Sequence, residues 1–161
     1  MSSFLSRLTV ERVARCPFTA AHEYVADFLR EAQRQVDVRV PLRDVVPLLG
    51  GSIAKPVELV FALQPDEHEG GRGHDAMQIA WRAQGRLFPD FHGALRLRIA
   101  SVETTLLTLE GAYQPPFGPA GRVVDALVGR RIARATMGEL LGRIAAELEA
   151  REERFRGDDP R

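Results

Sequence analysis

The chain has one cysteine, one lysine, no net charge and no long apolar run. Because Cys16 is alone, no disulfide can form within the chain. A formal net charge of zero removes the overall electrostatic reason to expect nucleic acid or an anionic membrane as a partner. The first residues include Arg7, unlike the apolar core of a signal peptide, and no apolar stretch reaches the length of about 18 residues that spans a membrane. We therefore expect a soluble cytoplasmic protein without nucleic-acid partners or integral membrane association.

Length and composition predict one folded unit. With 161 residues, 45% of them hydrophobic, the chain is long enough for one well-buried domain and too short for two. We expect a single domain over residues 1–156. The polar residues 157–161 are expected to form a disordered tail.

The run over residues 113–154 predicts a turn followed by one long amphipathic helix. The prolines and glycines of 115–121 prevent a regular helix before about Arg122, because proline lacks a donor and glycine is costly inside helices. At 100° per residue the apolar positions then share one arc. They are Val123, Ala126, Ala133, Met137, Leu140, Leu141, Ile144 and Leu148. This arc has to pack against an apolar surface.

The preceding residues predict strands and one shorter helix. Apolar positions alternate with polar ones over about 8–14, 36–42, 57–63, 76–83, 91–101 and 104–113, which is typical of an antiparallel sheet with one dry face. Residues 17–33 have the spacing of a helix. Pro41 cannot donate to a ladder and predicts an edge strand or a bulge, and the glycines and prolines of 47–56 predict a loop.

This order of elements resembles the helix-grip fold of the START-like superfamily. Two segments look similar to a polyketide cyclase-like bacterial group of the SRPBCC family. They are WRAQGRLFPDFHGAL and TLLTLEGAYQPPFGPAGRVVDALVGRRIARATMGELLGRIA. The resemblance implies an α+β fold in which a curved antiparallel sheet of about six or seven strands surrounds the C-terminal helix, with an apolar cavity between them. No catalytic residue set carries over, because the superfamily has no common one.

A cavity of this kind would be lined by the apolar faces of sheet and helix. Small residues on the helix, such as Ala133, would leave room, and the remaining lining is apolar or aromatic, as in small-molecule pockets. The predicted ligand-binding residues are Val40, Phe61, Ile79, Trp81, Phe91, Leu95, Leu109, Tyr113, Arg130, Ala133, Met137 and Leu141. The alternative is that these residues form an ordinary core that closes without a usable void.

Two of these residues carry polar groups. Arg130 falls within the apolar arc, and a desolvated guanidinium there would need a carboxylate from the protein or from the acidic head of a ligand. Alternatively its side chain extends to solvent. The Tyr113 hydroxyl faces either a ligand or a backbone group of the turn that follows.

Metal and catalytic patterns are weak. One flexible segment contains His68, His74 and the acidic residues of 66–75, but these residues lack the helical or strand spacing that would fix them as metal ligands. We therefore expect a solvated loop, no metal and no cofactor. Cys16 has no adjacent base and is interpreted as a residue at the start of a helix. Glu139, Arg143, Glu147 and Arg151 lie four residues apart and predict ion pairs on a solvent face of the long helix.

Two functions from different classes follow. The first is binding of a hydrophobic or amphipathic small molecule (lipid-, polyketide- or isoprenoid-like) in the cavity. The alternative is a cyclase- or dehydratase-like enzyme on a hydrophobic substrate, which requires an ionisable group directed into the cavity. Its candidates are Arg130, Tyr113, Glu110 and His92. A homodimer through the sheet is a third possibility, since edge strands pair readily.

Overall fold

One antiparallel sheet and two helices make up the described part of the chain. The structure, a computed structural model, describes residues 6–32, 36–41, 52–63, 75–83, 90–114 and 122–157. The elements follow in the order β1 (Ser6–Ala14), α1 (Phe18–Ala32), β2 (Val36–Pro41), β3 (Ser52–Leu63), β4 (Asp75–Ala83), β5 (Asp90–Ile99), β6 (Thr105–Gln114) and α3 (Arg122–Gly157). Within these residues, six strands form a sheet of order β1-β6-β5-β4-β3-β2. The expected α+β architecture is confirmed.

Most element boundaries agree with the sequence pattern, with two differences. The long helix begins at Arg122 as predicted, but it continues to Gly157, the first residue of the expected tail. The loop predicted over 47–56 is wrong from Ser52 onward, since β3 starts there and pairs with β2 along 52–57. Hydrogen bonds to a neighbouring strand stabilise this segment despite its unfavourable composition. β2 is an edge strand, as Pro41 predicted.

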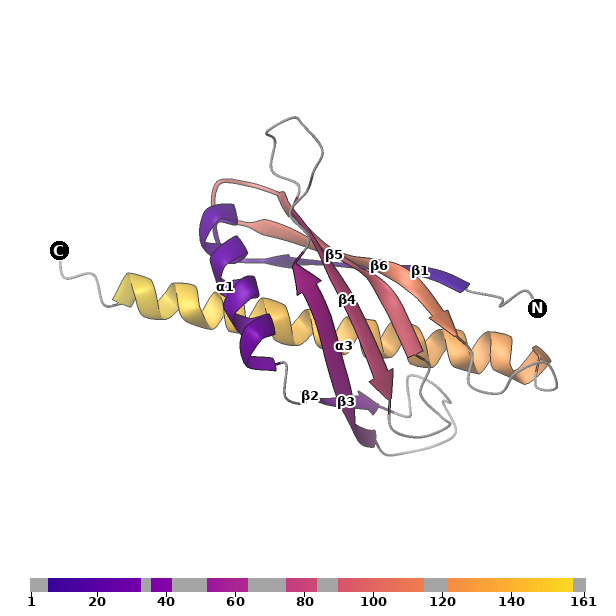
Figure 1. Cartoon of the computed structure of the whole chain (residues 1–161). Helices are drawn as coiled ribbons and strands as arrows, with labels where there is room; N and C mark the ends of the chain where they lie inside the picture. The colour runs from indigo at the N-terminus through magenta and orange to yellow at the C-terminus, as the bar shows by residue number, and fades with distance from the viewer. Residues whose placement is uncertain are drawn as a thin grey trace.

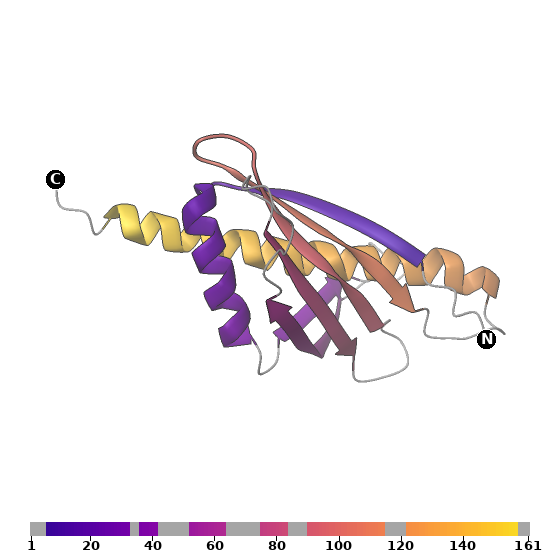
Figure 2. The same cartoon turned by 45° about the horizontal axis from the view of Figure 1, so that its top comes forward.

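The sheet curves around α3 so that both of its edges reach the helix. The backbone of α3 makes most of its close contacts with the sheet at β1 and β2, the first and last strands. Figure 1 shows α3 running along the whole molecule while the strands cross it, and Figure 2 shows the same arrangement with the top of the molecule turned forward. α1 packs against the C-terminal half of α3 and against β5. The concave face of the sheet is therefore the face that meets the helix.

The core lies between this concave face and α3. Its sheet side consists of alternate residues of β1, β4, β5 and β6, and its helix side of the arc predicted from the sequence. The buried residues include Leu8, Met77, Ile79, Phe91, Leu95, Leu97, Leu107, Leu109, Ala133, Met137, Leu140, Leu141, Ile144 and Leu148. From α1, Ala21, Val25 and Leu29 join the same cluster.

Two glycines face each other on the concave side of β5 and β6. Gly93 pairs with Gly111, and the ring of Phe91 covers both, 2.5 Å from where a Cβ on either would stand. A Cβ at Gly111 would also meet the carbonyl oxygen of His92. Glycine pairs covered by an aromatic ring are a device by which sheets bend. The missing side chains thus permit the curvature that brings the sheet edges to α3.

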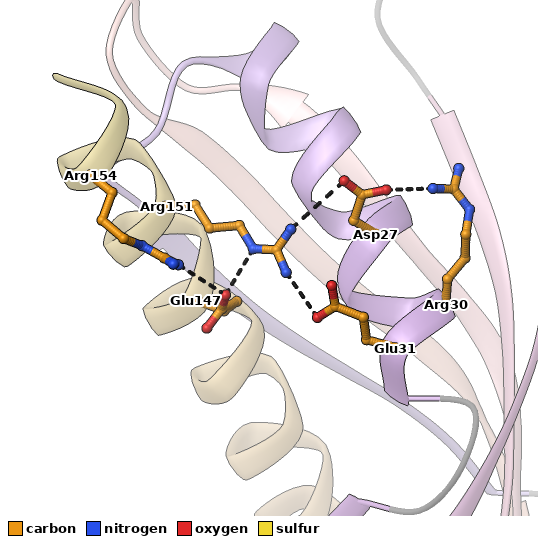
Figure 3. A network of polar contacts seen from close by, with 6 residues as sticks. All are labelled: Asp27, Arg30, Glu31, Glu147, Arg151 and Arg154. Carbon is orange, nitrogen blue, oxygen red and sulfur yellow. Dashed lines mark hydrogen bonds and ion pairs between the residues drawn. The ribbon is translucent and has the colours of Figure 1, made fainter. Parts of the chain in front are cut away.

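A polar network joins α1 to the C-terminal half of α3. Figure 3 shows the guanidinium of Arg151 between Glu147 of its own helix and Asp27 and Glu31 of α1. Its Nε donates to Glu147 at 2.8 Å and its Nη2 to Glu31 at 3.0 Å. The side chain of Arg151 is only 18% exposed, so these contacts are less screened than ordinary surface pairs. The solvent face predicted for this residue is therefore wrong: it is an interhelical contact.

A second polar contact fastens the end of β1 to α3. The backbone N–H of Arg15 donates to Glu149 Oε1 at 2.9 Å. This hydrogen bond lowers the pKa of Glu149 below its ordinary value. Desolvation of the carboxylate acts in the opposite direction, and the Arg15 guanidinium lowers the pKa further. The N–H that directly follows an edge strand is thereby satisfied by a charged acceptor.

The glycine pair provides a test of the curvature argument. We expect Gly111→Ala to lower the free energy of unfolding by about 1–3 kcal/mol, because its Cβ would overlap backbone and ring atoms. The control is Gly138→Ala on α3, where a Cβ meets nothing within 4 Å; it should raise stability by roughly 0.5–1 kcal/mol through helix propensity. Urea unfolding measures the free energy of unfolding of both variants. Equal changes in the two variants would contradict the conclusion that the glycine pair permits the curvature of the sheet.

Glu149 predicts a specific pH dependence. Because its folded pKa is below its unfolded value, the charge contributes stability in full above about pH 4.5, and this contribution disappears as the pH falls through the folded pKa. Glu149→Gln keeps an acceptor oxygen but removes the charge. It should be less stable than wild type at neutral pH, and this difference in urea unfolding should shrink progressively as the pH falls below about 4.5. A stability difference independent of pH would refute the assignment; Glu153→Gln, at an exposed position, is the control.

Candidate functional site

The predicted ligand-binding residues mostly meet between the concave face and α3. Five of them are buried on strands, namely Ile79, Phe91, Leu95, Leu109 and Tyr113, and three on the helix, namely Ala133, Met137 and Leu141. Val40, Phe61 and Trp81 occupy positions of β2, β3 and β4, but their side chains lie outside the described residues. Whether these residues bind a ligand remains a prediction.

The strand register extends this surface across the sheet. Tyr113 pairs with Phe91, and Phe91 pairs with Trp81, so three aromatic residues form a transverse row on β6, β5 and β4. The next row runs from Gly111 through Gly93 and Ile79 to Phe61. Sequence alternation identified the faces but not these rows, since rows depend on which strands are neighbours.

Arg130 extends to solvent, which is one of the alternatives that the sequence left open. Its side chain is exposed, whereas Ala133, three residues further along α3, is completely buried. The argument that a desolvated guanidinium needs a carboxylate therefore does not apply. A long flexible side chain at the margin of an apolar arc reaches water at little cost.

Two of the other three candidates for acid or base chemistry also face away from the core. His92 is exposed, as the sequence predicted for the wet face. Glu110 is half-exposed and accepts a hydrogen bond from Arg96 Nε at 2.8 Å on the convex face. Of the four candidates, Tyr113 is the one that the structure places in the core, at 2% exposure. No pair of these four groups converges on the concave face.

The described residues offer no metal site. Among them no group of three potential ligands comes together, and residues 66–74 of the suspected acidic loop lie outside them. No helix in the described ranges is long and apolar enough to cross a membrane.

A groove of about 550 Å³ opens on the surface beside β1. It is lined by Arg12, Ala135, Gly138, Glu139, Gly142, Arg143 and Ala146. Arg12 occupies a concave-face position but is exposed, and its guanidinium lies 3.3 Å from where a Cβ on Gly142 would stand. Glu139 and Arg143 pair across one wall at 3.1 Å. Since none of the predicted ligand-binding residues borders it, this polar groove is distinct from the predicted cavity.

Cys16 is a structural residue. It is fully buried just before α1, and its carbonyl oxygen accepts a 2.8 Å hydrogen bond from Thr105. Burial, and then the negative charge of nearby Glu152, raise the pKa of the thiol to about 11. A thiol with this pKa is protonated at neutral pH, which agrees with its interpretation as a helix-start residue.

Solved structures share this arrangement. TTHA0849 from Thermus thermophilus is 14% identical, with a TM-score of 0.51 over 91% of this chain and 99% of that one. The di-domain ARO/CYC BexL from the BE-7585A biosynthetic pathway is 11% identical, with a TM-score of 0.50 over 94% of this chain and 51% of that one. A START superfamily protein from Mycobacterium smegmatis is 14% identical, with a TM-score of 0.49 over 92% of this chain and 98% of that one.

The chain shares the START-like fold of these structures. No model of a protein family and no curated protein matches its sequence. At such low identities the similarity to solved structures concerns the fold, and a START-like fold does not by itself specify a reaction.

Burial of the Cys16 thiol predicts that it is modified slowly in the folded protein. A pKa raised from 9.0 to about 11 leaves about a hundredfold less thiolate than in the unfolded chain at pH 8. The reaction of Cys16 with Ellman's reagent should therefore be slow in the native protein and fast in denaturant. Equal rates in both conditions would show that Cys16 is accessible and ionisable in the folded protein.

Proposed function

We propose that this protein binds a hydrophobic or amphipathic small molecule, of lipid-, polyketide- or isoprenoid-like chemistry, between the concave face of its sheet and α3. One observation carries the proposal: the close backbone contacts of α3 with the sheet are mostly with its two edge strands, while the central strands present an apolar and aromatic face on the concave side. Binding sites for such molecules are concave, apolar and provided with few polar groups.

The chemistry of the described residues favours binding over catalysis. A cyclase- or dehydratase-like reaction needs at least one ionisable side chain directed at the substrate. Arg130 and His92 are exposed, and Glu110 pairs with Arg96 on the opposite face. The resemblance in fold to the di-domain ARO/CYC protein supports the enzyme as the second candidate.

Native mass spectrometry of the freshly purified protein tests the proposal directly. We expect a species heavier than the 17.9 kDa chain, whose added mass is lost on denaturation and identified as an apolar compound. A chain mass alone, together with no saturable uptake of N-phenyl-1-naphthylamine by the purified protein, would overturn the proposal.

A matched pair of variants on α3 places the bound molecule. Ala133 is buried on the side of α3 that faces the sheet, and Ala146 is exposed. Ala133→Leu should reduce the bound fraction several-fold, because the larger side chain fills space on the binding side, whereas Ala146→Leu should leave it unchanged. Near-ultraviolet circular dichroism checks that both variants are folded. Equal occupancy in the two variants would place the ligand elsewhere.

A further inference from the structure

One buried hydroxyl group on the concave face finds no partner among the described residues. The three buried threonines each donate a hydrogen bond: Thr105 to the Cys16 carbonyl at 2.8 Å, Thr108 to Glu11 at 3.3 Å, and Thr136 to the Ile132 carbonyl at 2.8 Å. Tyr113 is buried to 2% exposure, and its hydroxyl makes no hydrogen bond with any of the described residues. Since buried polar groups in folded proteins are nearly always paired, this hydroxyl requires an explanation.

The position of Tyr113 connects it with the proposed site. It is the penultimate residue of β6 and follows Leu107 and Leu109 on the buried face. Its neighbour across the ladder, Phe91, is completely buried, so two aromatic side chains occupy paired positions on the buried face. In both cartoon views the end of β6 lies near the N-terminal half of α3 (Figures 1 and 2).

The charge of the surroundings restricts what the hydroxyl can bind. Among the residues whose side chains the structure describes, no arginine is buried, and Arg130 and Arg12 both extend into solvent. An anionic ligand head at Tyr113 would therefore lose its hydration without gaining a cation from these residues, which is costly. A neutral oxygen has no such cost, and a phenol donates a strong hydrogen bond to it in apolar surroundings.

We propose that the Tyr113 hydroxyl is the polar anchor of the proposed binding site and donates a hydrogen bond to a neutral oxygen, such as a ketone carbonyl, on an otherwise apolar ring-bearing ligand. The ring preference comes from the two buried aromatic side chains, Phe91 and Tyr113, at paired positions of β5 and β6. This inference rests on the proposed function and narrows it: carboxylates such as fatty acids should bind less well than neutral aromatic or polycyclic ketones.

Three probes of one size separate these chemistries. 2-Acetylnaphthalene carries a ketone, 2-isopropenylnaphthalene is its hydrocarbon isostere, and 2-naphthoate is its carboxylate counterpart. Their affinities are measured for wild type, for Tyr113→Phe, and for Tyr24→Phe as control, because Tyr24 is the other tyrosine of the chain and lies on α1. Both substitutions remove only a hydroxyl.

We expect Tyr113→Phe to weaken the ketone about fivefold relative to the hydrocarbon, as the loss of one hydrogen bond does. Tyr24→Phe should change neither affinity. The carbonyl stretching band of the bound ketone should lie at lower frequency in wild type than in Tyr113→Phe. Without ligand, Tyr113→Phe should melt no lower than wild type, because its hydroxyl has no bond to a described residue to lose.

The outcomes distinguish failure of this inference from failure of the proposed function. If ketone and hydrocarbon bind but Tyr113→Phe affects them equally, or 2-naphthoate binds best, the anchor is wrong while ligand binding stands. A melting temperature clearly lowered in unliganded Tyr113→Phe but not in Tyr24→Phe would reveal a partner within the protein or a bound water and would also overturn it. If no probe binds to wild type, both proposals fall.

Discussion

The packing of the apolar side of α3 onto the concave face of the sheet is the interaction on which the rest of the structure depends. Neither surface is stable alone, since each exposes a continuous apolar area to water. Burying each Leu, Ile or Met side chain contributes about 1.5–3 kcal/mol, and such residues extend along the described helix from Met137 to Leu148. This packing requires a curved sheet, because both edge strands can contact the same helix only if the sheet bends around it. Gly93 and Gly111 provide room for it under the ring of Phe91.

Polar contacts are confined mainly to the ends and the outer surface of this core. Arg151 joins the two helices through three carboxylates, and Glu149 holds the end of β1. On the convex face, Arg96 and Glu110 form a half-exposed pair of the kind that contributes little to stability. The described side chains between the concave face and α3 are mostly apolar, and the buried threonines bond within the protein, so the Tyr113 hydroxyl would be the polar contact for a molecule bound there.

Much of this arrangement could be predicted from periodicity. The prolines and glycines of 115–121 placed the start of α3 at Arg122, and the helical arc identified Met137, Leu141 and their neighbours as buried. Strand alternation identified the buried positions Leu95 and Leu109. Such predictions succeed because the spacing of apolar residues is a local property of a helix or strand, and one face of each element has to be buried whatever its partner is.

The tertiary structure decided which polar groups are buried and which residues become neighbours. Arg130 fell in the apolar arc yet reaches water, whereas Arg151, predicted for a solvent face, is covered by α1. A helical wheel cannot distinguish these arginines, because the outcome depends on where along α3 a second element lies against it. The row of Tyr113, Phe91 and Trp81 likewise exists only through strand order and register. Periodicity in the sequence determined the faces, and long-range packing determined what each face meets, since contacts between distant segments are set by the shape of the whole chain.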